Sequence, residues 1–104
     1  MLRNNLDIKV GIIGLGVGEQ HIYGYELHPK CRVVKICDFN KDKLSEVKRR
    51  HPNYKAEIDP NEILNDPSID IVSIASFDNF HFHQIMQALD NDKNVFVEKP
   101  LCLI

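Results

Sequence analysis

The glycine-rich turn near the amino terminus constrains the fold more than any other feature of this chain. Residues 8–13 form a short apolar run, and Gly14 and Gly16 follow it directly. An apolar run of this length that ends in glycines is typical of a buried parallel strand. Residues 18–27 then show helical periodicity, which Pro29 ends. The turn therefore predicts a strand that passes through a tight loop directly into a helix.

The alternation of apolar runs and helical segments continues along the rest of the chain. Strands are expected at residues 32–37, 54–56, 69–75 and 94–98, and helices at residues 40–50, 60–66 and 79–91. Asn40 is a suitable N-cap for the second helix, and Asp59 followed by Pro60 for the third. Strands separated by helix-length segments form right-handed β-α-β crossovers. The order therefore predicts the α/β class, with a doubly wound parallel sheet of about five strands.

Each predicted helix carries side chains spaced to face the sheet. Those expected to point inward are Ile22, Tyr25 or Tyr23, Leu27, Leu44, Val47, Ile85, Ala88 and Leu89. His21 is expected to pack or cap within the first helix, and Cys37 to be a small core residue. No two cysteines have the Cys-x-x-Cys spacing, so the sequence predicts neither a disulfide framework nor a metal site.

Charge and hydropathy exclude several classes of partner. The net charge of −2 provides no basic field for nucleic acid, and the short basic run at residues 48–51 is expected to complement a helix dipole and face solvent. No apolar run is long enough to span a bilayer, and residues 1–7 lack the apolar segment of a signal peptide. We therefore expect one domain over residues 1–104 in the cytoplasm, with no nucleic-acid or membrane partner.

The glycine loop has the spacing of a dinucleotide-binding turn. Gly14 and Gly16 match the first two positions of Gly-x-Gly-x-x-Gly, where the first permits the tight turn and the second lets a pyrophosphate approach. Val17 and Gly18 begin the next helix, whose N–H groups and dipole favour phosphate, so all four are predicted cofactor contacts. Glu19 holds the third glycine position, and its carboxylate must point away from the pyrophosphate. The alternative is a purely structural turn.

An acidic residue supports the dinucleotide interpretation. Asp38 lies 22 residues after Gly16 and ends the second predicted strand, where an acid accepts hydrogen bonds from the adenosine ribose. Its charge would repel a 2′-phosphate, which favours NAD over NADP, while the nearby Lys41 and Lys43 keep NADP possible. The alternative is that Asp38 is only a turn residue that ends a strand.

With these residues in place, the chain resembles the amino-terminal, NAD(P)-binding Rossmann domain of the Gfo/Idh/MocA oxidoreductase family, which includes inositol and other sugar dehydrogenases. The resemblance runs from Lys9 to Leu101. The segments that carry it are residues 10–16, Asp38, Ile74-Ala75-Ser76, His81 and Val95-Phe96-Val97-Glu98-Lys99-Pro100. The last of these is the most specific, because the glycine loop alone matches many Rossmann families.

The resemblance implies roles for four further residues. Lys99 would contact the substrate hydroxyl and assist proton transfer during hydride transfer, and Glu98 would border the cofactor. Ser76 would line the nicotinamide side, although Phe77 replaces the proline that is usual in the family. His81 would help to shape the cofactor pocket, with a structural role as an equal alternative.

Family members continue into a substrate domain, which the resemblance implies is absent from residues 1–104. The expected function is dinucleotide binding within an oxidoreductase that transfers hydride between NAD(P) and a sugar or polyol. Such a substrate would bind only if a second domain is supplied, so catalysis by the chain alone is left open. The alternative is a non-catalytic nucleotide-binding or assembly module. The uncovered sheet edge and the apolar residues 101–104 predict self-association.

Overall fold

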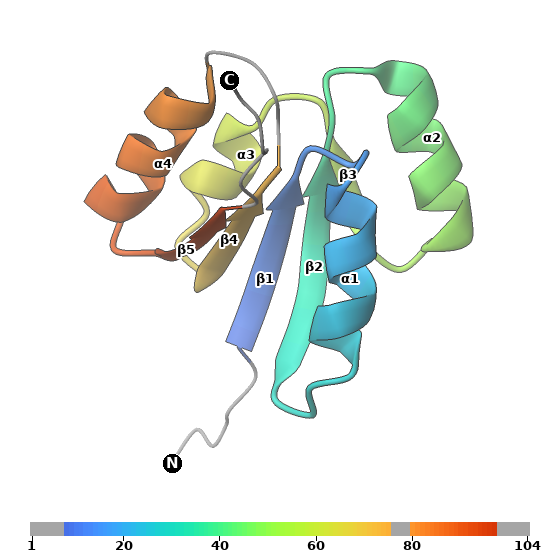
Figure 1. Ribbon diagram of the computed structural model, residues 1–104, viewed down its shortest axis with the longest axis horizontal. Helices are drawn as coiled ribbons and strands as arrows, with labels where there is room; N and C mark the ends of the chain where they lie inside the picture. The colour runs from blue at the N-terminus through green and yellow to red at the C-terminus, as the bar shows by residue number, and fades with distance from the viewer. Residues whose placement is uncertain (1–7, 76–79, 98–104) are drawn as a thin grey trace, which may run out of the picture.

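A single parallel sheet with helices on both faces forms the core of the protein (Figure 1). The computed structural model describes residues 8–75 and 80–97. Its strands are β1 (Ile8–Ile13), β2 (Cys31–Cys37), β3 (Lys55–Glu57), β4 (Ile71–Ile74) and β5 (Asn94–Val97), and its helices are α1 (Gly18–Glu26), α2 (Lys41–Arg50), α3 (Asn61–Leu64) and α4 (Phe80–Asp90). The strand order is β3-β2-β1-β4-β5, with every pair parallel. This order confirms the predicted doubly wound sheet, in which the chain winds outward from β1 in both directions.

Alternating side chains of β1 supply both halves of the core, because successive residues of a strand point to opposite faces. On one face, Val10 and Ile12 lie in a buried cluster with residues of α1 and α2, namely Ile22, Leu44 and Val47. On the other face, Ile13 lies in a cluster with residues of α3, β4 and α4, namely Ile63, Leu64, Val72, Ile74 and Ala88. Cys37 belongs to this second cluster and is 1% exposed, as predicted for a core residue.

The helix starts follow from local polar chemistry. The Asn40 side chain accepts hydrogen bonds from the backbone N–H groups of Asp42 (3.0 Å) and Lys43 (3.1 Å), which confirms it as the N-cap of α2. The expected N-cap of α3 was wrong by one residue, because Pro60 holds that position. Asp59 still accepts a hydrogen bond from the Asn61 N–H at 2.9 Å, so its carboxylate stabilises the same turn from one residue earlier.

Two leucines that were expected in the core are exposed. Leu27 is 85% exposed because it is the C-cap residue of α1 and lies beyond the last helical turn. Leu89 is 52% exposed. Its neighbour Ala88 is fully buried, and consecutive helical residues differ by about 100° around the axis. Both predictions were therefore wrong, whereas Ile22, Leu44, Val47 and Ala88 are buried as expected.

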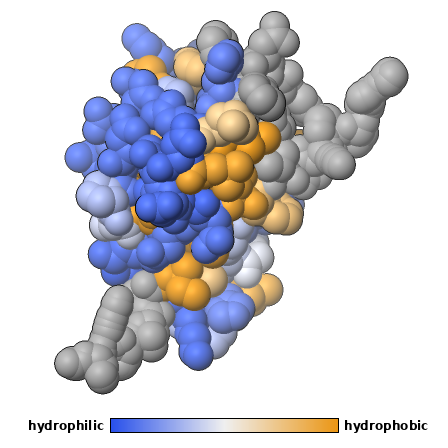
Figure 2. Space-filling model, turned by 90° about the vertical axis from the view of Figure 1, so that its left-hand side faces the viewer, coloured by the Kyte–Doolittle hydropathy of each residue, from blue (hydrophilic) through white to orange (hydrophobic). Residues whose placement is uncertain are grey.

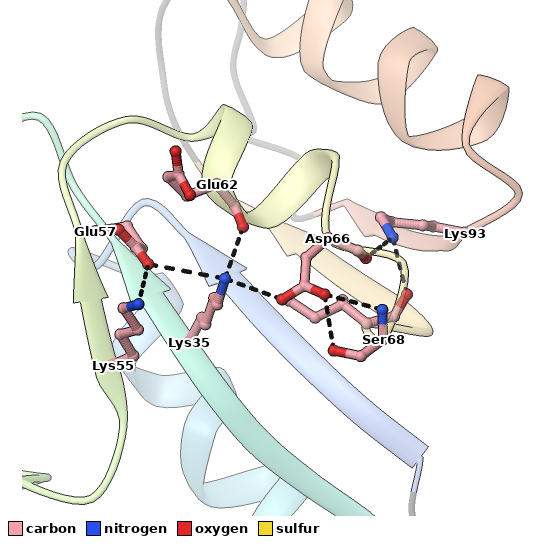
Figure 3. A network of polar contacts seen from close by, with 8 residues as sticks. Lys35, Lys55, Glu57, Glu62, Asp66, Ser68 and Lys93 are labelled. Atoms are coloured by element: carbon pink, nitrogen blue, oxygen red, sulfur yellow. Dashed lines mark hydrogen bonds and ion pairs between the residues drawn. The ribbon is translucent and has the colours of Figure 1, made fainter.

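A polar network fastens α3 to the sheet, and we call Lys35, Glu57, Asp66 and Lys93 the Lys35 cluster (Figure 3). The Lys35 ammonium lies 2.9 Å from an Asp66 carboxylate oxygen and donates to the Glu62 carbonyl at 2.9 Å. The Lys93 ammonium donates to the carbonyls of Asp66 (2.5 Å) and Ile69 (2.9 Å). The cluster thus satisfies backbone oxygens of α3 and of the turn that follows it.

Candidate functional site

The carboxyl ends of four strands meet at one edge of the sheet. The register aligns Ile13 with Cys37 on one side and with Ile74 on the other, and Ile74 with Val97. The carboxyl ends of β1, β2, β4 and β5 therefore lie side by side. Ligands of open parallel sheets bind outside this edge, near the point where the strand order reverses. Here that point lies beside β1, and the glycine loop follows β1.

The glycine loop leaves β1 through a turn that requires glycine. Gly14 has a φ of 90°, which side-chain-bearing residues rarely adopt, and its N–H donates to the Cys37 carbonyl at 2.9 Å. A Cβ placed on Gly16 would have no heavy atom within 4 Å, so the space beside this residue is open. The loop therefore has the tight turn and the bare backbone that a pyrophosphate needs.

Gly18 allows α1 to lie close to the sheet. A Cβ at this position would lie 3.1 Å from Cγ2 of Ile12 in β1 and 3.6 Å from Cβ of Ala75, which directly follows β4. Close packing of the helix on the strands is the role of the third glycine in a dinucleotide loop. In this chain the role falls to Gly18, one residue before the position that Glu19 occupies, and the sequence pattern alone did not reveal this.

Asp38 and the glycine loop form one hydrogen-bonded unit. One carboxylate oxygen of Asp38 accepts from the Leu15 N–H at 2.8 Å, and the other accepts from the Asn40 N–H at 2.8 Å. Each carboxylate oxygen can accept a further hydrogen bond, so two N–H contacts do not exhaust the group. The next residue, Phe39, is 52% exposed and borders a hollow of about 240 Å³ between the β2–α2 turn, α3 and α4.

The Glu19 carboxylate is held by α2. Its two oxygens accept hydrogen bonds from Nε and Nη2 of Arg50, both at 2.8 Å, and one oxygen lies 3.6 Å from Nε2 of His51. The Arg50 hydrogen bonds lower the pKa of Glu19, against the opposing effect of burial. Within the basic run that was expected to complement a helix dipole and face solvent, Arg50 therefore also has a specific partner in the first turn of α1.

His21 packs between α1 and the sheet, as the sequence predicted. Its Nδ1 lies 2.8 Å from the hydroxyl of Ser73 in β4, and its ring meets that of Phe96 edge-on with centroids 5.1 Å apart. His21 therefore has a structural role, because both contacts join α1 to strands of the sheet.

Several predicted site residues lie outside the described part of the chain. Ser76, Glu98 and Lys99 fall there. His81 lies in α4, but its side chain is not described. Gly14, Gly16, Val17, Gly18 and Asp38 are all described, and they lie together around the carboxyl ends of β1 and β2.

Residues 8–75 and 80–97 contain no group of three or more histidine, cysteine, aspartate or glutamate side chains that could hold a metal ion. In the same part of the chain, no helix is both long and apolar enough to cross a membrane.

Comparison with known proteins identifies close relatives of this arrangement. Residues 8–103 match a family described as an oxidoreductase family with an NAD-binding Rossmann fold. The chain is 34% identical over 97 residues to myo-inositol 2-dehydrogenase of Thermotoga maritima, and 35% identical over 98 residues to scyllo-inositol 2-dehydrogenase (NAD(+)) of Bacillus subtilis. Each alignment covers 92% of this chain but 29% of the relative.

A solved structure gives the same result. Myo-inositol dehydrogenase from Lactobacillus casei, in complex with NAD(H) and myo-inositol, superposes with a TM-score of 0.81 at 36% identity. The match covers 91% of this chain and 29% of that structure. The chain therefore spans less than a third of the length of these relatives.

Proposed function

Because the chain belongs to the Gfo/Idh/MocA family of oxidoreductases and forms its NAD-binding Rossmann domain, we propose that it holds NAD for hydride exchange with a sugar or polyol. The observation that carries this proposal is the bond between Asp38 and the Leu15 N–H. This hydrogen bond joins Asp38, which would bind the ribose, to the glycine loop, which would bind the pyrophosphate. It thereby fixes the position of one relative to the other.

The residues of the edge fit a dinucleotide. The open side of Gly16 and the start of α1 at Gly18 would receive the pyrophosphate, since backbone N–H groups at a helix start favour anions. Asp38 would accept hydrogen bonds from the adenosine ribose. Phe39, the residue after Asp38, lines a hollow that would have room for the adenine ring. NAD, when bound, supplies a hydride acceptor and donor at its nicotinamide ring.

The charge of Asp38 favours NAD over NADP. A 2′-phosphate on the ribose would lie against the Asp38 carboxylate, and the two negative charges would repel each other. Lys41 and Lys43 follow within five residues of Asp38, and they weaken this preference without removing it.

Lys99 is the residue to which we assign proton transfer. It comes two residues after Val97, the last residue of β5, in the Glu-Lys-Pro segment that resembles the family motif. The neutral amine of Lys99, beside the substrate hydroxyl, would accept the hydroxyl proton and become an ammonium as the carbon gives up hydride to NAD. The substrate class is a sugar or polyol by analogy with the inositol dehydrogenases.

Titration of the chain with NADH and NADPH by calorimetry tests the binding proposal. We expect NADH to bind more tightly, and Gly16→Ala to weaken NADH binding by about tenfold, because the methyl group fills the pyrophosphate's approach. Gly24→Ala is the matched control: its Cβ also meets nothing within 4 Å, but it lies in the last turn of α1, away from the glycine loop. Equal NADH affinity in the two variants, or no binding by the wild-type chain, would refute the proposal.

The Asp38 assignment has its own test. Asp38→Asn keeps an oxygen for the Leu15 N–H and removes the charge, so we expect the preference for NADH over NADPH to fall by about fivefold. An unchanged preference would show that the carboxylate does not face the 2′ position.

Catalysis is tested separately from binding. With NAD and myo-inositol, formation of NADH by the chain would support the enzyme interpretation, and Lys99→Met should abolish it while leaving NADH binding unchanged. Turnover that appears only when a separate substrate domain is added would also support the enzyme interpretation, and binding without turnover under both conditions would favour the alternative of a non-catalytic nucleotide-binding module.

We also propose that the chain self-associates through the β5 side. Phe96 is 47% exposed on β5, and Met86 (43%) and Leu89 (52%) are exposed on α4. Figure 2 views the protein from this side and has hydrophobic surface there among hydrophilic side chains. Phe96 also borders a hollow of about 490 Å³ beside α1. Sedimentation velocity should detect concentration-dependent association that Phe96→Ser reduces, and a monomer at all concentrations would contradict it.

A further inference from the structure

The first turn of α1 contains a carboxylate beside the place proposed for the pyrophosphate. Glu19 is the second residue of α1, and it is the acidic residue of that turn. The N-cap residue Val17 makes no side-chain cap hydrogen bond. A carboxylate near an uncapped helix start is attracted by the same N–H groups and dipole that attract a phosphate. Glu19 could therefore compete with the cofactor for the same site.

Arg50 removes that competitor in the observed structure. It reaches across from the last turn of α2 and binds both oxygens of Glu19, each at 2.8 Å (Figure 1 shows the end of α2 beside α1). The contact is a bidentate pair of hydrogen bonds, which fixes the orientation of the carboxylate and pairs its negative charge with the guanidinium. Glu19 is 9% exposed in this arrangement.

The neighbours of Glu19 reinforce this orientation. His51 lies 3.6 Å from one carboxylate oxygen, and its ring stacks on Tyr54 at an interplanar angle of 9°. The pKa of Glu19 is lowered chiefly by the Arg50 hydrogen bonds, so the group is ionised at neutral pH. A charge that is always present beside a phosphate site has to be directed elsewhere.

We propose that Arg50 is a positioning residue for cofactor binding, which holds the Glu19 carboxylate on α2 and away from the anion site at the start of α1. This inference rests on the proposed function. It predicts that loss of Arg50 weakens NADH binding only while the Glu19 carboxylate is present. A simple clamp between α1 and α2 would predict an effect on stability instead, and a direct contact of Arg50 with phosphate would predict an effect that does not depend on Glu19.

The test measures NADH affinity by calorimetry in the 104-residue chain. Arg50→Met should weaken binding about two- to fivefold, the range expected for one charge near a helix start. Arg49→Met is the matched control, since Arg49 is exposed, precedes Arg50 in the same helix and carries the same charge. It should leave the affinity unchanged. The double variant Glu19→Gln with Arg50→Met should restore the wild-type affinity.

The outcomes separate the interpretations. Equal affinities for Arg50→Met and Arg49→Met would overturn the inference, and so would a double variant as weak as Arg50→Met alone. Glu19→Gln by itself provides a second check that keeps Arg50 intact: it should bind NADH at least as well as wild type, and weaker binding would overturn the inference. A wild-type chain that binds no NADH refutes the proposed function instead, before any variant is compared.

Discussion

The two charged clusters of this domain use the same kinds of side chain for different purposes. In the pair of Glu19 and Arg50, both partners are side chains, and the Arg50 side chain is 48% exposed. In the Lys35 cluster, the two lysines also donate to the carbonyls of Glu62, Asp66 and Ile69. Loss of the first pair releases a charge near the glycine loop, whereas loss of the second leaves backbone oxygens without donors.

The difference teaches that position in the fold, and not charge, decides what a polar cluster does. The Lys35 cluster lies under α3, on the opposite face of the sheet from α1 and α2, and its lysines are fixed by backbone oxygens (Figure 3). We therefore expect changes around α3 to alter the free energy of unfolding with little effect on NADH affinity. Changes at Glu19 and Arg50 should do the reverse.

The largest expected effect comes from the contact between β1 and α3. A Cβ on Gly11 would lie 2.5 Å from Cγ2 of Ile63 and 3.3 Å from Cδ1 of Ile69, both in the buried core. Gly11→Ala should therefore lower the free energy of unfolding by about 3 kcal/mol, as for an overpacked core. Urea denaturation measures this, with Gly24→Ala as a control that should be neutral or stabilising. A Gly11→Ala protein as stable as wild type would mean that α3 can move away from β1 without a loss of stability.

Lys93 provides the next largest effect. Its side chain is 4% exposed, and its ammonium donates to the carbonyls of Asp66 and Ile69. Lys93→Met keeps most of the apolar stem but removes both hydrogen bonds, so we expect a loss of about 2 kcal/mol. Thermal denaturation should show the loss, and NADH affinity of the folded variant should be unchanged. A weaker NADH affinity would contradict the separation of the two regions.

Acid unfolding tests the charge within the same cluster. Burial would raise the pKa of Asp66, but hydrogen bonds from Lys35 and Ser68 outweigh it and lower the pKa to about 2. A carboxyl whose pKa is lower in the folded state stabilises the protein above its ordinary pKa, 3.8 for this group. This stabilisation, about 2 kcal/mol, should be lost as the pH falls from about 4 to about 2. The stability of Asp66→Asn should depend less on pH over this interval, and parallel curves would refute the assignment.

The sequence predicts the fold well because its signals are local. The apolar runs, the glycine turn and the Asn40 cap each act within a few residues, and together they define a parallel α/β sheet. The sequence also predicted that Asp38 stands at the end of a strand, and it directly follows β2. Its bond to the Leu15 N–H depends on the pairing of β1 with β2, which brings together residues 23 positions apart.

The contacts that the sequence could not predict join elements that are distant along the chain. Arg50 meets Glu19 across 31 positions, and only the packing of α2 beside α1 brings them together. Lys93 follows a helix in a polar turn, where a lysine ordinarily faces solvent, yet it is buried because carbonyls near α3 need donors. The site roles assigned from the sequence all stay predictions: those of Gly14, Gly16, Val17, Gly18, Asp38, Ser76, His81, Glu98 and Lys99.

The smallest expected effect comes from Lys55, an exposed lysine that contacts Glu57 of the Lys35 cluster. The ammonium groups of Lys35 and Lys55 both lie 3.8 Å from the same Glu57 oxygen, but their side chains are 17% and 70% exposed. Water screens the exposed pair, so Lys55→Gln should change the free energy of unfolding by less than about 0.5 kcal/mol. Lys35→Met, which also loses the Asp66 and Glu62 contacts, should cost about 2 kcal/mol. Urea denaturation of both variants gives the comparison. Equal losses would mean that Glu57, the partner they share, carries the stabilisation, and that the backbone contacts of Lys35 contribute little.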